Sequence, residues 1–328
     1  MRFAVKERTE SRHIGFGKVI LFGEHFVVYG AEAIVAGIVE YTSCALELQR
    51  GRPGLRVVDE RPAVRGYIPA KAAEQRRAHQ LVLSHLHIDT STDGLRVHLA
   101  GPLVPSSGIG ASASDVVSLA RALSEMYALH LNNEEVNNAA FVGEGGYHGT
   151  PSGVDNTAAT YGGLISYRRS GGKSIFSRLA LNNTLYLVVC STGITASTIE
   201  VVKDVKRRKA ADPAWFNALL ERYNACVTAA REAMMRGDLQ QVGKLMNENH
   251  TLCQQLTVSC AELDTIVDYC REKGALGAKM SGTGRGGLVV ALAADEAQRD
   301  RIADDLAKNC PATKYVWKYS VLPMGSKL

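Results

Sequence analysis

The chain has 328 residues, of which 46% are apolar, and its formal net charge is +5 at neutral pH. This size and composition indicate a globular protein of roughly two domains. They exclude a membrane-spanning chain, because no apolar run reaches the ~18 residues that a transmembrane helix needs. The densest basic group, Lys203 with Lys206–Lys209, has acidic neighbours and helical spacing. We interpret it as a solvated helix face, and we expect no nucleic-acid or membrane partner.

The cysteines and the two ends of the chain bear on its compartment. Seven cysteines are scattered, odd in number and without a C-x-x-C pair, which argues against a zinc site or disulfides and for a reducing compartment. The N-terminal residues lack the apolar core of a secretory signal. Ser326-Lys327-Leu328 matches the import signal of peroxisomes. We therefore expect a peroxisome-type organelle (a peroxisome or glycosome) and its import receptor as a partner, with the cytosol as the alternative.

The first half of the chain mixes the two kinds of secondary structure. Period-2 and apolar runs predict six strands, and 3.6-residue periodicity predicts three helices. The predicted strands cover residues 19–22, 27–29, 34–38, 42–48, 55–58 and 95–99, and the predicted helices cover 70–87, 114–130 and 133–145.

A new strand at residues 185–189 opens the second half. Helices are predicted at 197–210, 213–236, 238–256, 260–273 and 295–308, and strands at 288–292 and 315–321. Because strands and helices do not alternate steadily, we predict an α+β fold. The two domains are expected to cover residues 1–183 and 184–328.

The most informative stretch is the loop at residues 105–115, Pro-Ser-Ser-Gly-Ile-Gly-Ala-Ser-Ala-Ser-Asp, which leads into a helical pattern. Gly108 and Gly110 allow the backbone to approach a ligand, and the helix that follows attracts anions at its N-terminus. This arrangement predicts a phosphate-binding loop. The same G-x-G-x-x-[GA] pattern recurs at Gly282–Gly287 without a helix after it, so a simple tight turn stays an alternative for both loops.

Three further groups could carry chemistry. Lys18 precedes an apolar strand and could face a phosphate, or it could be an ordinary charge at a strand end. Glu24-His25 interrupts an apolar stretch, where burying an unpaired polar pair is costly, so we expect the pair to face a cavity, with a polar partner in the core as the alternative. Glu144 and Asp155 flank a segment rich in glycine and proline that can bring them to one site as metal ligand and base. Asp155 could instead cap the helix that follows it.

Four motifs spread over nearly the whole chain resemble the mevalonate kinase branch of the superfamily named for galactokinase, homoserine kinase, mevalonate kinase and phosphomevalonate kinase. They cover residues 17–30 (GKVILFGEHFVVYG), 108–113 (GIGASA), 148–156 (HGTPSGVDN) and 279–287 (KMSGTGRGG). The resemblance implies a two-domain small-molecule kinase fold, with an N-terminal domain similar to a ribosomal-protein and elongation-factor module and a ferredoxin-like C-terminal domain. It also implies phosphorylation of mevalonate to 5-phosphomevalonate, with ATP and Mg²⁺ as cofactors. The chain does not report its oligomeric state, and a homodimer stays open.

The resemblance also implies a role for each matching position. Asp155 would be the catalytic base, and Lys18 would pair with it and stabilise the developing charge. Ser112 and Glu144 would hold magnesium. The triphosphate would lie against the loop formed by Pro105, Ser107, Gly108, Gly110, Ala111, Ser112 and Ala113. Mevalonate would contact Lys18, Glu24, His25, Asp155, Thr198 and Gly282.

Departures from the family pattern leave some questions open. Ala111 replaces the first serine of a pair, so one hydroxyl contact to phosphate is expected to be missing. Arg285 replaces a small residue and could contact phosphate or face solvent. Arg168 and Arg169 could meet a substrate carboxylate, although their charge also suits a surface. The alternatives to a mevalonate kinase are another kinase of the superfamily and a non-catalytic ligand sensor on the same scaffold.

Overall fold

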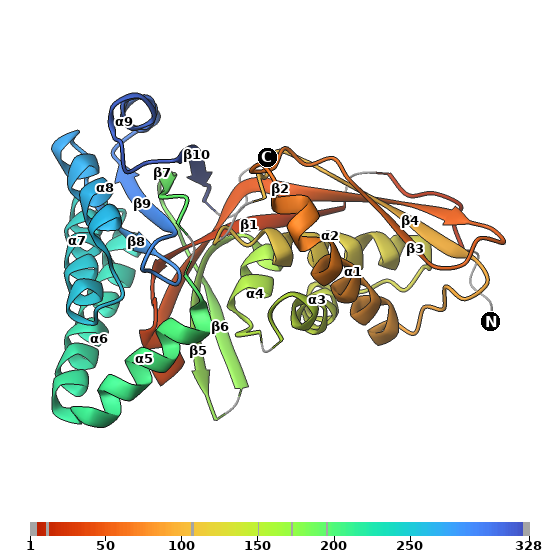
Figure 1. The fold of residues 1–328 in the computed structure, drawn as a ribbon, viewed down its shortest axis with the longest axis horizontal. Coiled ribbons are helices and arrows are strands. Elements are labelled where there is room, and N and C mark those ends of the chain that lie inside the picture. The colour runs from red at the N-terminus through yellow and green to blue at the C-terminus, as the bar shows by residue number, and fades with distance from the viewer. Residues whose placement is uncertain are drawn as a thin grey trace. The chain divides into compact units, whose positions relative to one another are not determined.

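The chain divides into two compact units. The computed structural model describes residues 5–10, 13–105, 108–149, 151–171, 173–194 and 196–323. Unit 1 contains the residues up to Lys18 together with Glu40–Gly162, and unit 2 contains Val19–Val39 together with the residues from Gly163 onward. The chain passes from one unit to the other within strands β1 (His13–Phe22) and β2 (Ala33–Gln49), which can be followed in Figure 1.

This division differs from the predicted boundary near residue 183. The difference arises from two strands that the sequence patterns did not reveal, β5 (Gly163–Ser170) and β6 (Lys173–Leu179). β5 pairs with Ala33–Gly37 of β2, and β6 pairs with β5, both antiparallel. Hydrogen bonds between strands distant in sequence therefore group residues 19–39 and 163–183 with the C-terminal half.

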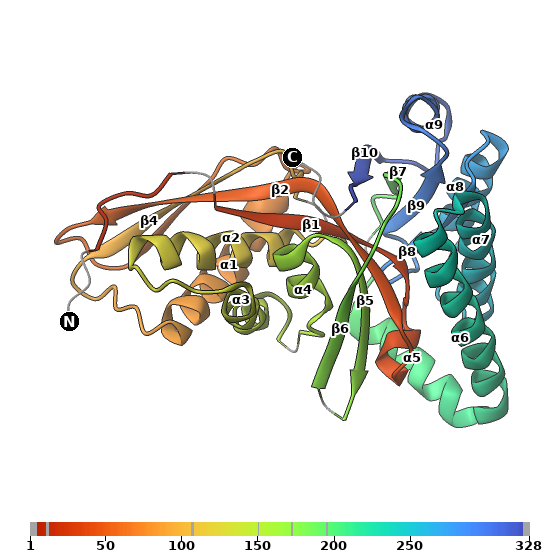
Figure 2. The same ribbon diagram turned by 180° about the vertical axis from the view of Figure 1, so that it is seen from behind.

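In unit 1, helices lie against one side of a sheet. Ser43–Gln49 of β2 pair antiparallel with β4 (Gly94–Ala100), and β4 pairs parallel with β3 (Leu55–Asp59). Figures 1 and 2 show the helices on the same side of these strands in both views. The helices are α1 (Tyr67–His85), α2 (Ala111–Met126), α3 (Asn133–His148) and α4 (Val154–Tyr161).

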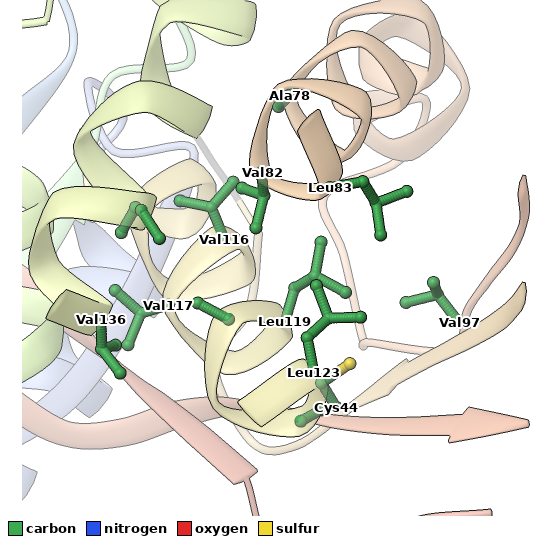
Figure 3. Packing of buried hydrophobic residues seen from close by; sticks show 14 of the residues in the cluster. Cys44, Ala78, Val82, Leu83, Val97, Val116, Val117, Leu119, Leu123 and Val136 are labelled. Carbon is green, nitrogen blue, oxygen red and sulfur yellow. The ribbon is translucent and has the colours of Figure 1, made fainter. Parts of the chain in front are cut away.

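The core of unit 1 forms around α2. Twelve of its sixteen residues are buried, so this helix is apolar on nearly every side and must be surrounded by other elements. Figure 3 shows Leu119 and Leu123 of α2 beside Cys44 of β2, Val97 of β4 and Leu83 of α1. Burial on all sides fixes the position of α2, and with it the loop that precedes the helix.

The C-terminal part of unit 2 has ferredoxin-like topology. β7 (Leu185–Ser191), β8 (Gly277–Ser281), β9 (Leu288–Ala293) and β10 (Tyr315–Val321) form an antiparallel sheet in the order β10-β7-β9-β8. With α8 (Ala261–Glu272) between β7 and β8, and α9 (Glu296–Asn309) between β9 and β10, the order is β-α-β-β-α-β. Additional helices precede α8, namely α5 (Thr198–Ala211), α6 (Pro213–Arg236) and α7 (Leu239–Gln255).

Most predicted elements are confirmed. The strand predicted at 19–22 begins earlier, at His13, strand β8 was not predicted, and three further elements differ. The predicted strand at 27–29 is wrong, because Phe26–Tyr29 form the 3₁₀ helix η1 that ends at Gly30 in the left-handed region. The two strands predicted at 34–38 and 42–48 are one long strand, β2. Helix α2 begins at Ala111 instead of residue 114, because Gly110 supplies the turn that starts it.

The structure bears on two expectations, the absence of membrane-spanning helices and the absence of disulfides. In the described ranges, no helix is both long and apolar enough to cross a bilayer. All seven cysteines lie in the described part of the chain and are free thiols, six of them buried.

A buried polar network lies behind the first turn of α2. Asp115 is fully buried and accepts hydrogen bonds from His79 Nε2 at 2.8 Å, Tyr147 Oη at 2.6 Å and Gln75 Nε2 at 3.1 Å. Burial raises the pKa of Asp115, but His79, Arg61 and Tyr147 more than offset this effect and lower the pKa to about 2. The carboxylate therefore joins helices α1, α2 and α3.

Replacing Asp115 by Asn should make unit 1 less stable and less sensitive to acid. The folded-state pKa lies below the ordinary value of 3.8, so the charge contributes stability above pH 4 that is lost as the pH falls towards 2. The shift corresponds to roughly 2 kcal/mol. Urea unfolding between pH 2 and pH 7 checks this. Parallel pH profiles for wild type and Asp115→Asn would contradict the assignment.

Candidate active site

The predicted phosphate loop has the backbone that a phosphate site needs. Gly108 and Gly110 have φ values of 94° and 73°, in the region that favours glycine. Gly110 is the N-cap of α2, and no side chain caps this helix end. The N–H groups of the first turn therefore stay available to an anion. Pro105 is described and buried, whereas Ser107 lies outside the described residues.

Lys18 packs against this loop. Its backbone N–H donates to the carbonyl oxygen of Ile109 at 2.9 Å. A Cβ added at Gly110 would lie 2.7 Å from Lys18 Cγ, so only glycine permits this approach. Gly15, three residues earlier on β1, is packed more closely still, because an added Cβ would lie 2.2 Å from the Ser114 carbonyl oxygen. Strand β1 and the start of α2 therefore hold each other in place.

Lys18 forms an ion pair with Asp155. Lys18 Nζ lies 3.2 Å from Asp155 Oδ1, and the lysine side chain is almost fully buried. Asp155 belongs to the first turn of α4, but Gly153 is the N-cap of that helix. The alternative that Asp155 is the helix cap is thus not what the structure shows. Asp155 is instead a partly exposed carboxylate held by a buried ammonium group.

Glu144 and Ser112 supply oxygen atoms near this pair. Burial raises the pKa of Glu144 to about 8, with a further increase from Asp155 and opposing effects from the Ser112 hydroxyl and Lys18. Glu144 Oε1 is buried and has no hydrogen-bond partner in the described structure. An unsatisfied oxygen beside a hydroxyl suits a hard cation that takes its remaining ligands from phosphate groups. In the described residues, no group of three or more ionisable ligands could hold a metal ion alone.

His148 is a neighbour of these residues to which the sequence assigned no role. Its Nε2 lies 3.1 Å from Ser112 Oγ and 3.9 Å from Glu144 Oε2. Burial lowers the pKa of His148, although nearby Asp155 partly opposes this effect. The spacing of four residues from Glu144 on α3 is the signal that could have placed both side chains on one helix face.

The remaining predicted site residues belong to unit 2, where the third glycine motif brings them together. His25 has a φ of 60° and its ring Nε2 donates to the carbonyl oxygen of Thr283 at 2.7 Å. Thr198 Oγ1 lies 2.7 Å from Thr283 Oγ1. Gly282, just before Thr283, has a φ of 90°. Burial lowers the pKa of His25, partly opposed by the Thr283 carbonyl and Glu24.

Glu24 has a partner that the sequence did not identify. Lys279 Nζ donates to Glu24 Oε1, and both side chains are fully buried. Lys279 also donates to the carbonyl oxygen of Met280 at 2.6 Å. The pair joins the segment after β1 to strand β8, so Glu24 and the third motif are held together in unit 2.

The arginines that the sequence left open lie at the protein surface. Arg285 Nη1 is 2.6 Å from Asp204 Oδ2, and its Nε donates to the Thr257 carbonyl at 3.3 Å. This side chain therefore joins the third motif to α5 and to the turn that follows α7. Arg168 and Arg169 are exposed on β5.

The contact between Gly110 and Lys18 can be tested against a matched glycine. Gly51 has a φ of 63° and open space around an added Cβ, whereas Gly110 has a similar φ of 73° and meets Lys18. Gly51→Ala should cost about 1 kcal/mol through backbone strain alone. Gly110→Ala should cost more, and a Lys18→Ala background should remove the excess. Thermal unfolding measures all four free energies, and equal costs for the two glycines would contradict the contact.

The buried pair in unit 2 makes a second test possible. Lys279→Met should cost about 3–5 kcal/mol of unfolding free energy, because it leaves the Glu24 carboxylate buried without its partner. Adding Glu24→Gln should recover part of that loss. Lys203→Met is the control, since its pair with Glu200 is about two-thirds exposed and should be worth less than about 1 kcal/mol. Additive effects of the two buried substitutions in denaturant unfolding would rule out the coupling.

Comparisons with known proteins agree with this geometry. Residues 73–163 match the model of the GHMP kinases N terminal domain, and residues 230–312 match that of the GHMP kinases C terminal domain. The mevalonate kinase of Thermococcus gammatolerans is 35% identical over 90% of this chain and 92% of its own, and that of Aeropyrum pernix is 33% identical over 87% and 89%.

A solved structure extends this likeness to the whole fold. The crystal structure of L. major mevalonate kinase in complex with R-mevalonate is 61% identical, covers 99% of this chain and 100% of its own, and superimposes with a TM-score of 0.97. The sequence and structural matches both span the two domains of the fold. The chain therefore belongs to the mevalonate kinases of the GHMP kinase family.

Proposed function

We propose that this chain transfers the γ-phosphoryl group of ATP to the primary hydroxyl of mevalonate and forms 5-phosphomevalonate. The observation that carries the proposal is the Lys18–Asp155 pair, 3.2 Å apart and adjacent to the phosphate loop. Family membership supports the same reaction, because the relatives and the solved neighbour are mevalonate kinases. A phosphoryl-transfer enzyme needs this combination of positioning and charge stabilisation more than covalent chemistry.

Asp155 accepts the proton of the substrate hydroxyl. The carboxylate of Asp155 is 28% exposed, so a substrate oxygen can reach it, whereas Lys18 is 5% exposed and water has little access to it. The Lys18 ammonium stabilises the charge that develops on the hydroxyl oxygen and on the transferring group. The free N–H groups at the start of α2 hold the phosphates of ATP.

Ser112 and Glu144 are the residues that would hold Mg²⁺. Their hydroxyl and carboxylate oxygens, one of them without a partner, fit a cation that binds one or two protein ligands together with phosphate oxygens. Bound Mg²⁺ neutralises phosphate charge. Glu144 must be ionised to bind it, and the cation's charge would oppose the burial that raises the Glu144 pKa to about 8.

In unit 2, the substrate-binding residues are His25, Thr198 and Thr283, and Thr283 contacts both of the others. The hydrogen bond to Thr283 fixes the proton of His25 on Nε2, which leaves Nδ1 as an acceptor for a substrate hydroxyl. Binding of a substrate carboxylate by Arg168 and Arg169 stays a prediction. Ser326-Lys327-Leu328 lies outside the described residues, and import into a peroxisome-type organelle stays a prediction with it.

The reaction is tested by ADP release with four acceptors: mevalonate, phosphomevalonate, galactose and homoserine. Wild type should turn over mevalonate in preference to the other three. Asp155→Asn should lower kcat by about 10²–10⁴, because it removes a general base, while the affinity for ATP changes little. A mevalonate-inactive wild type would overturn the proposed reaction. Unchanged turnover in Asp155→Asn would overturn only the base assignment.

A further inference from the structure

A groove lies in unit 1, at the opposite end of α2 from the phosphate loop. It has a volume of about 610 Å³ and is lined by the residues before β1, the start of β1, the end of α2 and the start of α3. The first residue of α2 that lines the groove is Arg121, ten residues beyond the start of this helix. At 1.5 Å per residue, this corresponds to roughly 15 Å along the helix. The groove is therefore separate from the phosphate loop.

The polar side chains of this groove are mostly basic. Lys6, His13, Arg121 and His130 line it, and Glu125 is its one carboxylate among the described residues. Glu125 already pairs with Lys6 at 2.7 Å and with His13 at 2.6 Å. The charge of Arg121 is thus not balanced by Glu125.

Arg121 is bonded to neutral oxygen atoms. Its guanidinium donates to the carbonyl of Ile14, to the carbonyl of Thr160 at 2.7 Å and to Asn133 Oδ1 at 3.1 Å. Burial lowers the pKa of Arg121, and no carboxylate in the described part of the chain opposes this effect. A guanidinium has five N–H donors, so donors remain for a further acceptor. A partly buried cation without a counter-charge attracts an anion.

The same contacts connect the groove to the catalytic pair. Ile14 belongs to β1, which carries Lys18, and Thr160 belongs to α4, which carries Asp155. Arg121 therefore holds both elements by their backbone carbonyls. A ligand that fixes Arg121 would also stabilise these two segments.

We propose that this groove is a binding site for a small organic anion, whose phosphate or carboxylate group contacts Arg121, Lys6 and His130. The volume exceeds that of a simple inorganic anion, and Ile14, Leu131 and Val136 line the groove as well. These side chains suit a short apolar part of the ligand. Lys6 and His130 are exposed and outside the catalytic machinery, so they can be replaced without disturbing Lys18 or Asp155.

Three probes with the same ring separate the chemistries: phenyl phosphate, benzoate and neutral benzyl alcohol. Calorimetry on the full chain, with ADP present to occupy the phosphate loop, should show binding of at least one anion. That anion should bind at least ten times more tightly than benzyl alcohol. Whichever anion binds more tightly identifies the phosphate or the carboxylate as the preferred group. Failure of both anions to bind, or equal binding of benzyl alcohol, would overturn the proposal.

Variants locate the binding. The double variant Lys6→Gln/His130→Gln should lower the affinity for the anion at least tenfold. Arg56 is an exposed arginine outside the groove lining, and Arg56→Gln should leave this affinity unchanged. Binding of the anion should slow the amide hydrogen exchange of residues 121–136. Through Arg121, it should also slow the exchange of residues 13–18 and 154–161. Unchanged affinity in the double variant, or slowing confined to 108–114, would contradict the groove site. Since no turnover is measured, these results do not depend on the proposed kinase activity.

Discussion

Unit 1 depends on one constraint: a buried ammonium group must lie against both a glycine loop and a carboxylate. Lys18 meets it because Gly110 has no Cβ to displace the lysine chain and because the Ile109 carbonyl holds the lysine backbone. Asp155 meets it because Gly153 starts α4 and leaves the aspartate free of capping. The packed helix α2 fixes the loop, and Asp115 fixes α2 from behind. Without this rigidity, the pair would be an ordinary, weak ion pair.

Buried charges in both units hold loops that would otherwise be loosely placed. Asp115 joins three helices of unit 1, and Lys279 joins Glu24 to the third glycine motif in unit 2. For Asp115 the partners more than offset the cost of burial, since its pKa is lowered to about 2. These pairs fix the positions of the segments they join, because separating the partners would leave a buried charge without compensation. This accounts for strongly polar residues at positions that packing alone would fill with apolar side chains.

Sequence patterns predicted the long helices and the family motifs, because periodicity and glycine positions are local properties. They missed β5 and β6, and with them the grouping of residues 19–39, because strand pairing depends on partners far apart in the chain. They also missed Lys279 as the partner of Glu24, 255 residues away. A strand was predicted at Val27–Tyr29 because two β-branched valines favour a strand, although Gly30, which ends η1, favours a turn. Local chemistry was visible in the sequence, and long-range pairing was not.

The account rests on Lys18 and Asp155 acting as one unit, and a double-mutant cycle on kcat tests this most directly. Residues that act together in one step are strongly non-additive. The account predicts that Lys18→Met/Asp155→Asn turns over mevalonate about as slowly as the slower single variant. If the losses of the two single variants multiply in the double variant, the two residues act independently, and the proposed catalytic pair is contradicted.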